Sequence, residues 1–238
     1  MESLLNKIVL IVGGTGGIGA EAARLIHLSG AKVFISSRDK SKLDTLCNAI
    51  GIPDNHRFVL DLKDSDAIKK MVEVVQVSEG PIDILINAAG IGIIKPFESL
   101  SQIDLRDSLE VNLIGAFNLI QAVLPAMKEQ KKGLIINIPG VLGKTPMAGA
   151  AAYAASKYGL NGMLKSLREE LKRTEIRITN VYMGGVDSPF WDLIDLKVQR
   201  DKMIAVKEAG KSIWFLCQQP RTAVVSEMVI QPFNHQAI

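Results

Sequence analysis

The chain has 238 residues, a length that suits one domain around a single large core. Hydrophobic residues make up 47% and charged residues 22%, a balance that excludes a disordered protein. The net charge of +3 is small and dispersed, so nothing in the composition indicates a nucleic-acid-binding protein.

Short β-branched runs alternate with longer amphipathic stretches along the whole chain. Several runs are apolar at nearly every position, as in strands that are covered on both faces. The alternation predicts an α/β fold with a parallel sheet built from right-handed crossovers. The expected strands are Lys7–Val12, Lys32–Ser36, His56–Leu60, Ile82–Ile86, Leu134–Ile138, Ile176–Val181 and Glu227–Ile230. The expected helices lie near residues 17–29, 39–49, 64–78, 101–130, 151–173 and 202–218.

No linker or repeat interrupts this pattern, so residues 1–238 are predicted to form one domain. Pro125 lies inside one expected helix, which should kink or end near it. Cys47 and Cys217 are far apart and lack a C-x-x-C partner, so neither a disulfide framework nor a metal site is predicted. No signal peptide or apolar run long enough to span a bilayer is evident, and a cytoplasmic protein without a membrane partner is expected.

The first expected strand leads into a glycine-rich turn. Its residues Gly14-Thr15-Gly16-Gly17-Ile18-Gly19 match G-x-G-x-x-G, and Gly13 extends the match. Glycines let the backbone turn tightly and approach a pyrophosphate at the positive end of the next helix. The turn lacks the G-K-[ST] ending of nucleoside-triphosphate loops. A dinucleotide site is therefore predicted.

The end of the second expected strand bears on which dinucleotide binds. Ser37 occupies the position where an acidic side chain would hold the ribose 2′-hydroxyl, and Arg38 follows it. This pair suits a 2′-phosphate and favours NADP(H) over NAD(H). Two alternatives stay open: Ser37 and Asp39 simply cap the next helix, or Asp39 itself accepts the ribose hydroxyl.

Tyr153 and Lys157 lie four residues apart in an alanine-rich helical run, so their side chains share one helix face. A free phenol has a pKa of about 10, too high for efficient proton exchange near neutral pH. A cation about 4.5 Å away would lower the pKa of the phenol toward the working pH. The pair predicts proton transfer to a carbonyl or alcohol oxygen, and an ordinary surface pair is the alternative.

Two further motifs complete a family pattern. Asn87-Ala88-Ala89-Gly90 follows the fourth expected strand, and Asn112 lies in Val111-Asn112-Leu113. With the glycine-rich turn and the Tyr153/Lys157 pair, the chain resembles the short-chain dehydrogenases/reductases over essentially its whole length. The resemblance implies a three-layer Rossmann fold, with a doubly wound, mostly parallel seven-stranded sheet and helices on both faces.

The resemblance also implies roles for individual residues. Tyr153 would be the acid/base, Lys157 would lower its pKa and bind the nicotinamide ribose, and Asn112 would keep a water in line for proton relay. Each asparagine could instead have a purely structural role: Asn112 as an interior amide with all its hydrogen bonds made, and Asn87 as the end of a strand. The implied cofactor contacts are Gly13, Thr15, Gly16, Gly17, Ile18, Gly19, Ser37, Arg38, Asp61, Leu62, Asn87, Ala88, Ala89, Gly90, Tyr153, Lys157, Gly185, Val186 and Ser188.

The chain departs from the family at Gly140, because the family has a serine thirteen residues before the tyrosine. Losing that hydroxyl would cost roughly 2–4 kcal/mol of transition-state stabilisation. Three explanations stay open. A water or Thr145 replaces the hydroxyl, the substrate fills the gap, or the protein binds NADPH as a sensor or interaction subunit with little turnover.

The substrate pocket is expected at the carboxyl ends of the strands, between residues 141–152 and 186–203. Lys95 and Lys144 are the only candidates to hold an anionic substrate, and a solvated role is the alternative for each. The expected pocket is apolar, and its predicted substrate-contacting residues are Gly140, Leu142, Met147, Phe190 and Trp191.

Helices 101–130 and 151–173 carry apolar residues on more than one face. The resemblance implies that a second copy covers them in a homodimer or homotetramer, and packing inside one chain is the alternative. The expected function is an NADP(H)-dependent oxidoreductase that interconverts a carbonyl and an alcohol. A related epimerase or lyase that uses the same Tyr/Lys pair also remains open.

Overall fold

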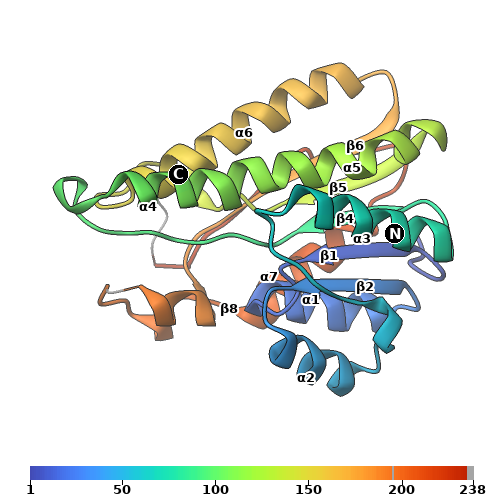
Figure 1. Cartoon of the computed structure of the whole chain (residues 1–238), viewed down its shortest axis with the longest axis horizontal. Helices are drawn as coiled ribbons and strands as arrows, with labels where there is room; N and C mark the ends of the chain where they lie inside the picture. Colours follow the sequence, from blue (N-terminus) through green and yellow to red (C-terminus); the bar gives the residue numbers. More distant parts are fainter. Residues whose placement is uncertain (195, 235–238) are drawn as a thin grey trace.

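A computed structural model of the chain describes residues 1–194 and 196–234. Asp195 of the expected substrate loop and the last four residues of the expected domain lie outside the described residues. Seven parallel strands form the central sheet in the order β3-β2-β1-β4-β5-β6-β9 (Figure 1). The strands are β1 (Ile8–Val12), β2 (Lys32–Ser37), β3 (Arg57–Val59), β4 (Ile84–Asn87), β5 (Lys132–Asn137), β6 (Glu175–Met183) and β9 (Glu227–Ile230).

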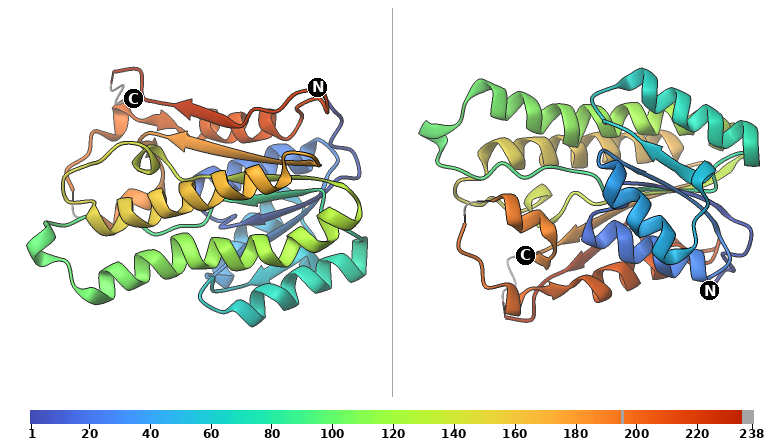
Figure 2. Two further views of the ribbon diagram at one scale, coloured as in Figure 1. Left: turned by 90° about the horizontal axis from the view of Figure 1, so that it is seen from above. Right: turned by 60° about the horizontal axis from the view of Figure 1, so that its bottom comes forward.

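Helices cover both faces of this sheet (Figures 1 and 2). One layer contains α1 (Gly17–Leu28), α2 (Lys40–Ile50) and α7 (Val206–Leu216). The other contains α3 (Ser65–Glu79), α4 (Gln102–Leu109), α5 (Gly115–Glu129) and α6 (Ala151–Leu171). Side chains along β1 alternate between two buried cores, with Val9 in one and Leu10 in the other. The predicted doubly wound Rossmann fold is confirmed, and the two cores explain why the strand sequences are apolar throughout.

The helix expected over residues 101–130 differs from its prediction at two points. A π-helical turn, Glu110–Ile114, separates α4 from α5. The helix does not end at Pro125 and continues to Glu129. Pro125 and Gln121 are both exposed, so water can satisfy the Gln121 carbonyl that lost its helical donor. Of the two expected outcomes near Pro125, the helix end is wrong and the kink stays a prediction.

By length and composition alone, the helix Gln102–Glu129 is apolar enough to cross a membrane, contrary to the expectation from the sequence. In the described part of the chain, 39% of the most apolar 18-residue stretch of this helix is buried. It packs beside α3 and α6. Length and composition are weak evidence of a membrane span, because core helices of globular proteins also meet these two criteria.

The segment before α7 holds structure that the sequence pattern did not predict. Strands β7 (Val186–Asp187) and β8 (Ile204–Ala205) pair in parallel, and the Ile204 amide donates to the Gly185 carbonyl at 2.9 Å. This pairing brings together the two ends of the substrate loop. Short helical turns occupy η1 (Asp54–His56), η2 (Phe97–Ser99), η4 (Val141–Gly143), η5 (Pro189–Leu193) and η6 (Arg200–Lys202).

Candidate active site

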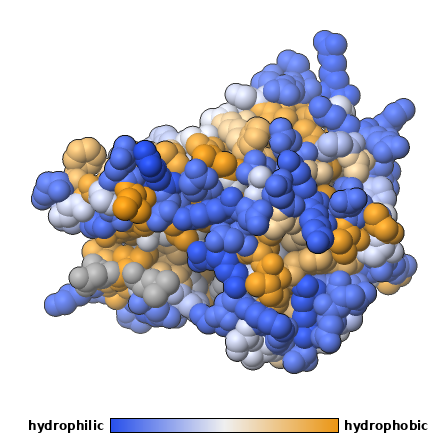
Figure 3. Space-filling model, viewed as in Figure 1, coloured by the Kyte–Doolittle hydropathy of each residue, from blue (hydrophilic) through white to orange (hydrophobic). Residues whose placement is uncertain are grey.

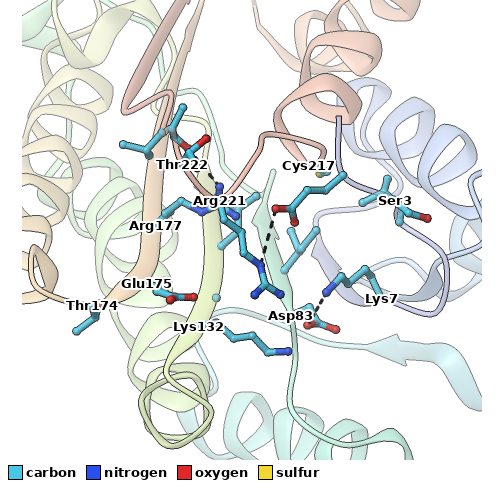
Figure 4. A pocket seen from close by; sticks show the side chains of 17 residues that line it. Ser3, Lys7, Asp83, Lys132, Thr174, Glu175, Arg177, Cys217, Arg221 and Thr222 are labelled. Carbon is cyan, nitrogen blue, oxygen red and sulfur yellow. Dashed lines mark hydrogen bonds and ion pairs between the residues drawn. The ribbon is translucent and has the colours of Figure 1, made fainter.

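Two cavities lie at opposite ends of the sheet. The smaller, about 270 Å³, lies at the amino ends of the strands and is crossed by ion pairs such as Lys7–Asp83 at 3.4 Å (Figure 4). None of the predicted site residues lines it. The larger cleft, about 940 Å³, lies at the carboxyl ends and is lined by the glycine-rich turn, residues 88–90, Tyr153 and Lys157. Ligands of open α/β sheets bind at this end, so the larger cleft is the candidate active site.

The glycine-rich turn packs tightly against the segment after β4. Gly13 has a φ of +78°, and a Cβ there would lie 2.6 Å from backbone atoms of Ala89. A Cβ on Gly19 would lie 2.6 Å from the Gly13 carbonyl. Gly16 is the N-cap of α1 and provides no side-chain cap, so the first amides of this helix keep their hydrogens available. This backbone surface fits the diphosphate of a dinucleotide.

The end of β2 places the expected 2′-phosphate residues beside the turn. The Thr15 and Ser37 hydroxyls lie 2.6 Å apart, and the Arg38 side chain is exposed. Asp39 caps α2, because its carboxylate accepts the Lys42 amide at 3.0 Å. This cap supports the helix-capping alternative for Asp39. The buried Ser37 hydroxyl accepts the Asp39 amide at 3.3 Å, whereas the exposed Arg38 guanidinium suits a phosphate.

Two of the expected cofactor contacts, Asp61 and Leu62, differ in their exposure. Asp61 is exposed, and its carboxylate accepts the Lys63 amide at 3.0 Å. Leu62 is only 6% exposed and packs in the core. A Cβ added to Gly115 would lie 2.8 Å from the Cβ of Leu62. The Leu62 side chain is therefore unavailable to a cofactor, and only its backbone remains a predicted contact.

Tyr153 and Lys157 lie on α6 and both line the cleft. The Lys157 Nζ lies 5.5 Å from the centroid of the Tyr153 ring and donates to the Ile138 carbonyl at 3.3 Å. Gly90 makes room for this arrangement, because a Cβ there would lie 3.1 Å from Nζ and 3.0 Å from the Asn112 Oδ1. The structure thus brings the three predicted catalytic residues into one neighbourhood.

Burial disfavours the charged forms of both members of the pair. It raises the pKa of Tyr153, and it lowers the pKa of Lys157 to about 8. For Tyr153 this is the opposite of the direction expected from the sequence, because desolvation by burial is the cause that acts on the pKa of the phenol. The phenol therefore stays protonated at neutral pH.

The depressed pKa of Lys157 makes stability depend on pH. Between about pH 8 and 10.5 the unfolded chain binds more protons at this lysine than the folded protein, so stability rises with pH. Relative to Lys157→Met, we expect the free energy of unfolding of the cofactor-free protein to gain about 2 kcal/mol from pH 7 to 9.5. Urea unfolding at several pH values measures it, with the exposed Lys70→Met as control. A flat difference would contradict a buried, partly neutral Lys157.

Asn112 lies on the π-helical turn, a distortion that often occurs at functional sites. Its Oδ1 accepts the Ile91 amide at 2.9 Å, and its Nδ2 donates to the Ile91 carbonyl at 3.0 Å. Nδ2 also donates to the Ser156 hydroxyl at 2.9 Å, and that hydroxyl donates to the Tyr153 carbonyl at 2.7 Å. Asn112 is therefore a satisfied amide that links the Ile91 segment to α6, and its role in holding a water stays a prediction.

Ser156 is a site residue that the sequence analysis overlooked. Its signal was present, because it lies three residues after Tyr153 and directly before Lys157. Asn87, in contrast, ends β4: its Nδ2 donates to the Asn137 Oδ1 and its own Oδ1 accepts the Ala89 amide, both at 3.3 Å. Asn87 thereby shapes the turn that leads into the cleft.

Gly140 differs from the expected serine in more than its side chain. Its φ is +70°, a conformation that L-residues rarely adopt. Space is not the constraint, because the nearest atom to a Cβ there would be the Met183 carbonyl oxygen at 3.6 Å. A serine at this position would be strained on the present backbone path.

The expected substrate residues Gly140, Leu142, Met147, Phe190 and Trp191 all line the cleft. The Phe190 ring centroid lies 6.1 Å from that of Tyr153, and the Trp191 indole donates to the Val186 carbonyl at 2.9 Å. Gly185, Val186 and Ser188 line the same cleft, and a Cβ on Gly17 would lie 2.9 Å from the Ser188 Cβ. The loop 186–203 therefore borders both the glycine-rich turn and Tyr153.

Neither of the two lysines named as candidates to hold a substrate anion is free to do so. Lys95 pairs with Asp104 at 2.7 Å, and Lys144 pairs with Glu227 at 2.5 Å. Lys197 and Lys202, which the sequence analysis overlooked, line the cleft instead. Only the folding of the loop shows this, because both lysines look like ordinary exposed residues in the sequence.

Comparisons with known proteins give the same picture. A family model described as short chain dehydrogenase matches residues 7–198. The 3-oxoacyl-[acyl-carrier-protein] reductase of Thermotoga maritima is 32% identical over 95% of this chain and 96% of its own length. An uncharacterised oxidoreductase of Staphylococcus saprophyticus is 30% identical over 98% of this chain and 100% of its own length.

Solved structures are similar over nearly the whole chain. A metagenomic short-chain oxidoreductase in complex with NADP has a TM-score of 0.84 at 31% identity, covering 98% of this chain and 100% of that chain. An actinorhodin polyketide ketoreductase variant with NADPH has a TM-score of 0.85 at 26% identity, covering 98% of each chain. With the family model matching most of its residues, the chain belongs to the short-chain dehydrogenase family.

Proposed function

We propose that the protein is an NADP(H)-dependent oxidoreductase that interconverts a carbonyl and an alcohol by hydride transfer. The observation that carries this proposal is that Tyr153, Lys157 and the glycine-rich turn line one cleft. The NADP and NADPH complexes of similar structures support it. The relative from Thermotoga maritima, named as a 3-oxoacyl reductase, supports a carbonyl substrate.

The residues present fit NADP(H). The backbone of Gly16–Gly19 would hold the pyrophosphate, and Thr15, Ser37 and Arg38 would hold the 2′-phosphate. Lys157 would hold the nicotinamide ribose. When bound, the nicotinamide supplies or accepts the hydride.

In the reducing direction, Tyr153 donates a proton to the oxygen that becomes the alcohol. Its raised pKa keeps the phenol protonated at neutral pH, so the proton is available. With a pKa of about 8, Lys157 is mostly charged at pH 7 and stabilises the phenolate that remains. Phe190 and Leu142 line the same cleft with apolar side chains.

The test is NADPH oxidation by the purified protein with a panel of aldehydes, ketones and 3-oxo compounds. Turnover of any of these supports the proposal. NADPH binding without turnover, together with a change of oligomer on binding, would favour the sensor alternative. The sensor alternative rests on Gly140, because the family's serine hydroxyl is missing at this position.

Gly140→Ser and Gly140→Ala should both lose about 1–2 kcal/mol of stability, because each side chain is strained at a φ of +70°. We expect neither variant to gain turnover, since the added side chain would sit on a strained backbone. Thermal unfolding and carbonyl reduction measure the two effects. A rate tens-fold higher for Gly140→Ser than for Gly140→Ala would show that the missing hydroxyl limits this protein.

We infer that the chain acts as a single domain in a cytoplasmic homodimer or homotetramer. Ile103, Phe117 and Tyr158 of the α4–α6 layer are 70%, 46% and 43% exposed. Hydrophobic atoms also reach the surface at the end of the molecule where α4 lies (Figure 3). A second copy would cover this face. Light scattering that gives the mass of one chain would contradict an oligomer, and fractionation of cells tests the location.

A further inference from the structure

The rim of the cleft is positively charged. Its charged lining residues are Lys157, Lys197 and Lys202, and the lining holds no carboxylate within residues 1–194 and 196–234. Lys197 and Lys202 are exposed, and neither forms an ion pair in the described part of the chain. Within the described residues these two cations have no ion-pair partner, so they can attract an anionic ligand to the cleft.

A separate ion cluster explains why nearby carboxylates do not neutralise these lysines. The Arg200 Nε lies 2.6 Å from Asp187, and its Nη1 lies 2.6 Å from Asp192. Its Nη2 donates to the Ser188 carbonyl at 3.0 Å. One guanidinium thus engages both of these carboxylates and holds the loop in shape. Neither Asp187 nor Asp192 forms an ion pair with Lys197 or Lys202.

Deeper in the cleft the wall is apolar. Leu142, Met147, Phe190 and Trp191 line it, and the Phe190 ring is close to that of Tyr153. A ligand whose reacting end lies at Tyr153 therefore contacts hydrophobic side chains there and reaches the lysines with its other end. The phosphates of a dinucleotide have their own donors in the glycine-rich turn and at Ser37 and Arg38.

We propose that the substrate is a carbonyl compound with an apolar chain that ends in an anionic group, bound by Lys197 and Lys202. This rests on the proposed function and narrows its substrate class. The carbonyl would lie at Tyr153, and the anion would lie at the rim. Ion pairs between the ligand's anionic group and these lysines would be exposed to solvent. The expected contribution of each lysine to the binding of the substrate is therefore modest and sensitive to salt.

The experiment compares an aliphatic oxo acid with its methyl ester, which differ in charge and share the reacting carbonyl. The wild type should reduce the acid with the higher kcat/KM. The double variant Lys197→Gln, Lys202→Gln should lower kcat/KM for the acid about five- to tenfold and leave the ester unchanged. The affinity for NADPH should stay the same. Lys70→Gln, an exposed lysine outside the cleft lining, should change neither substrate.

Equal losses for acid and ester, or a weaker affinity for NADPH in the double variant, would overturn the proposal. The second result would assign the lysines to the cofactor phosphates. If no carbonyl compound is turned over, the proposed function fails by itself, and binding of acid and ester to the NADPH-loaded protein decides. The anion site is supported if the wild type binds the acid more tightly than the ester and the double variant does not. Equal affinities of the wild type for acid and ester overturn the proposal.

Discussion

Tyr153→Phe is expected to lower carbonyl reduction by about a thousandfold, because positioned acid–base groups typically contribute 10²–10⁴ to the rate. The substitution removes only the hydroxyl that donates the proton. The ring that packs near Lys157 and Phe190 remains. We therefore expect kcat to fall while the affinity for NADPH stays within about twofold. Steady-state kinetics and cofactor titration measure the two quantities.

Tyr158→Phe is the matched control, because Tyr158 lies on the same helix and is 43% exposed. It should retain full activity. If Tyr153→Phe reduces carbonyl compounds as fast as wild type, the proton comes from another group and the proposed mechanism is wrong. If the wild type and Tyr153→Phe are equally inactive over a wide substrate panel, the sensor alternative gains support.

Gly13→Ala is expected to lower the free energy of unfolding by about 3 kcal/mol. The φ of +78° penalises any L-residue by about 1 kcal/mol, and a methyl group there would lie 2.6 Å from backbone atoms of Ala89. Backbone cannot move aside as a flexible side chain can, so overpacking adds about 1–3 kcal/mol. Thermal unfolding should show a midpoint lower by roughly 10 °C.

Gly16→Ala provides the matched control within the same turn. Gly16 has a φ of −70°, and the closest atom to a Cβ there would be the Gly13 carbonyl oxygen at 3.4 Å. Its loss of stability should be about 1 kcal/mol or less, as for glycine-to-alanine changes at helix N-caps. Equal losses in the two variants would show that the turn does not have the close contact between Gly13 and Ala89.

The fold and the main motifs could be predicted because they depend on local patterns. Runs that are apolar at every position predicted strands covered on both faces, and β1 indeed contributes to both cores. The spacing of Tyr153 and Lys157 placed both on one helix face, where the structure has them. The glycine-rich turn could be located because strand, turn and helix follow each other directly in the chain.

What the sequence by itself determined was the layered fold and the place of the glycine-rich turn, Tyr153 and Lys157 at its cleft, since backbone periodicity and glycine geometry are local properties. Only the tertiary structure decided the charges and the backbone path within the cleft. The direction of the Tyr153 pKa depends on desolvation. Lys95 and Lys144 form ion pairs, while Lys197 and Lys202 form none with the residues that the structure describes. These properties depend on neighbours distant in sequence, and no local pattern specifies them.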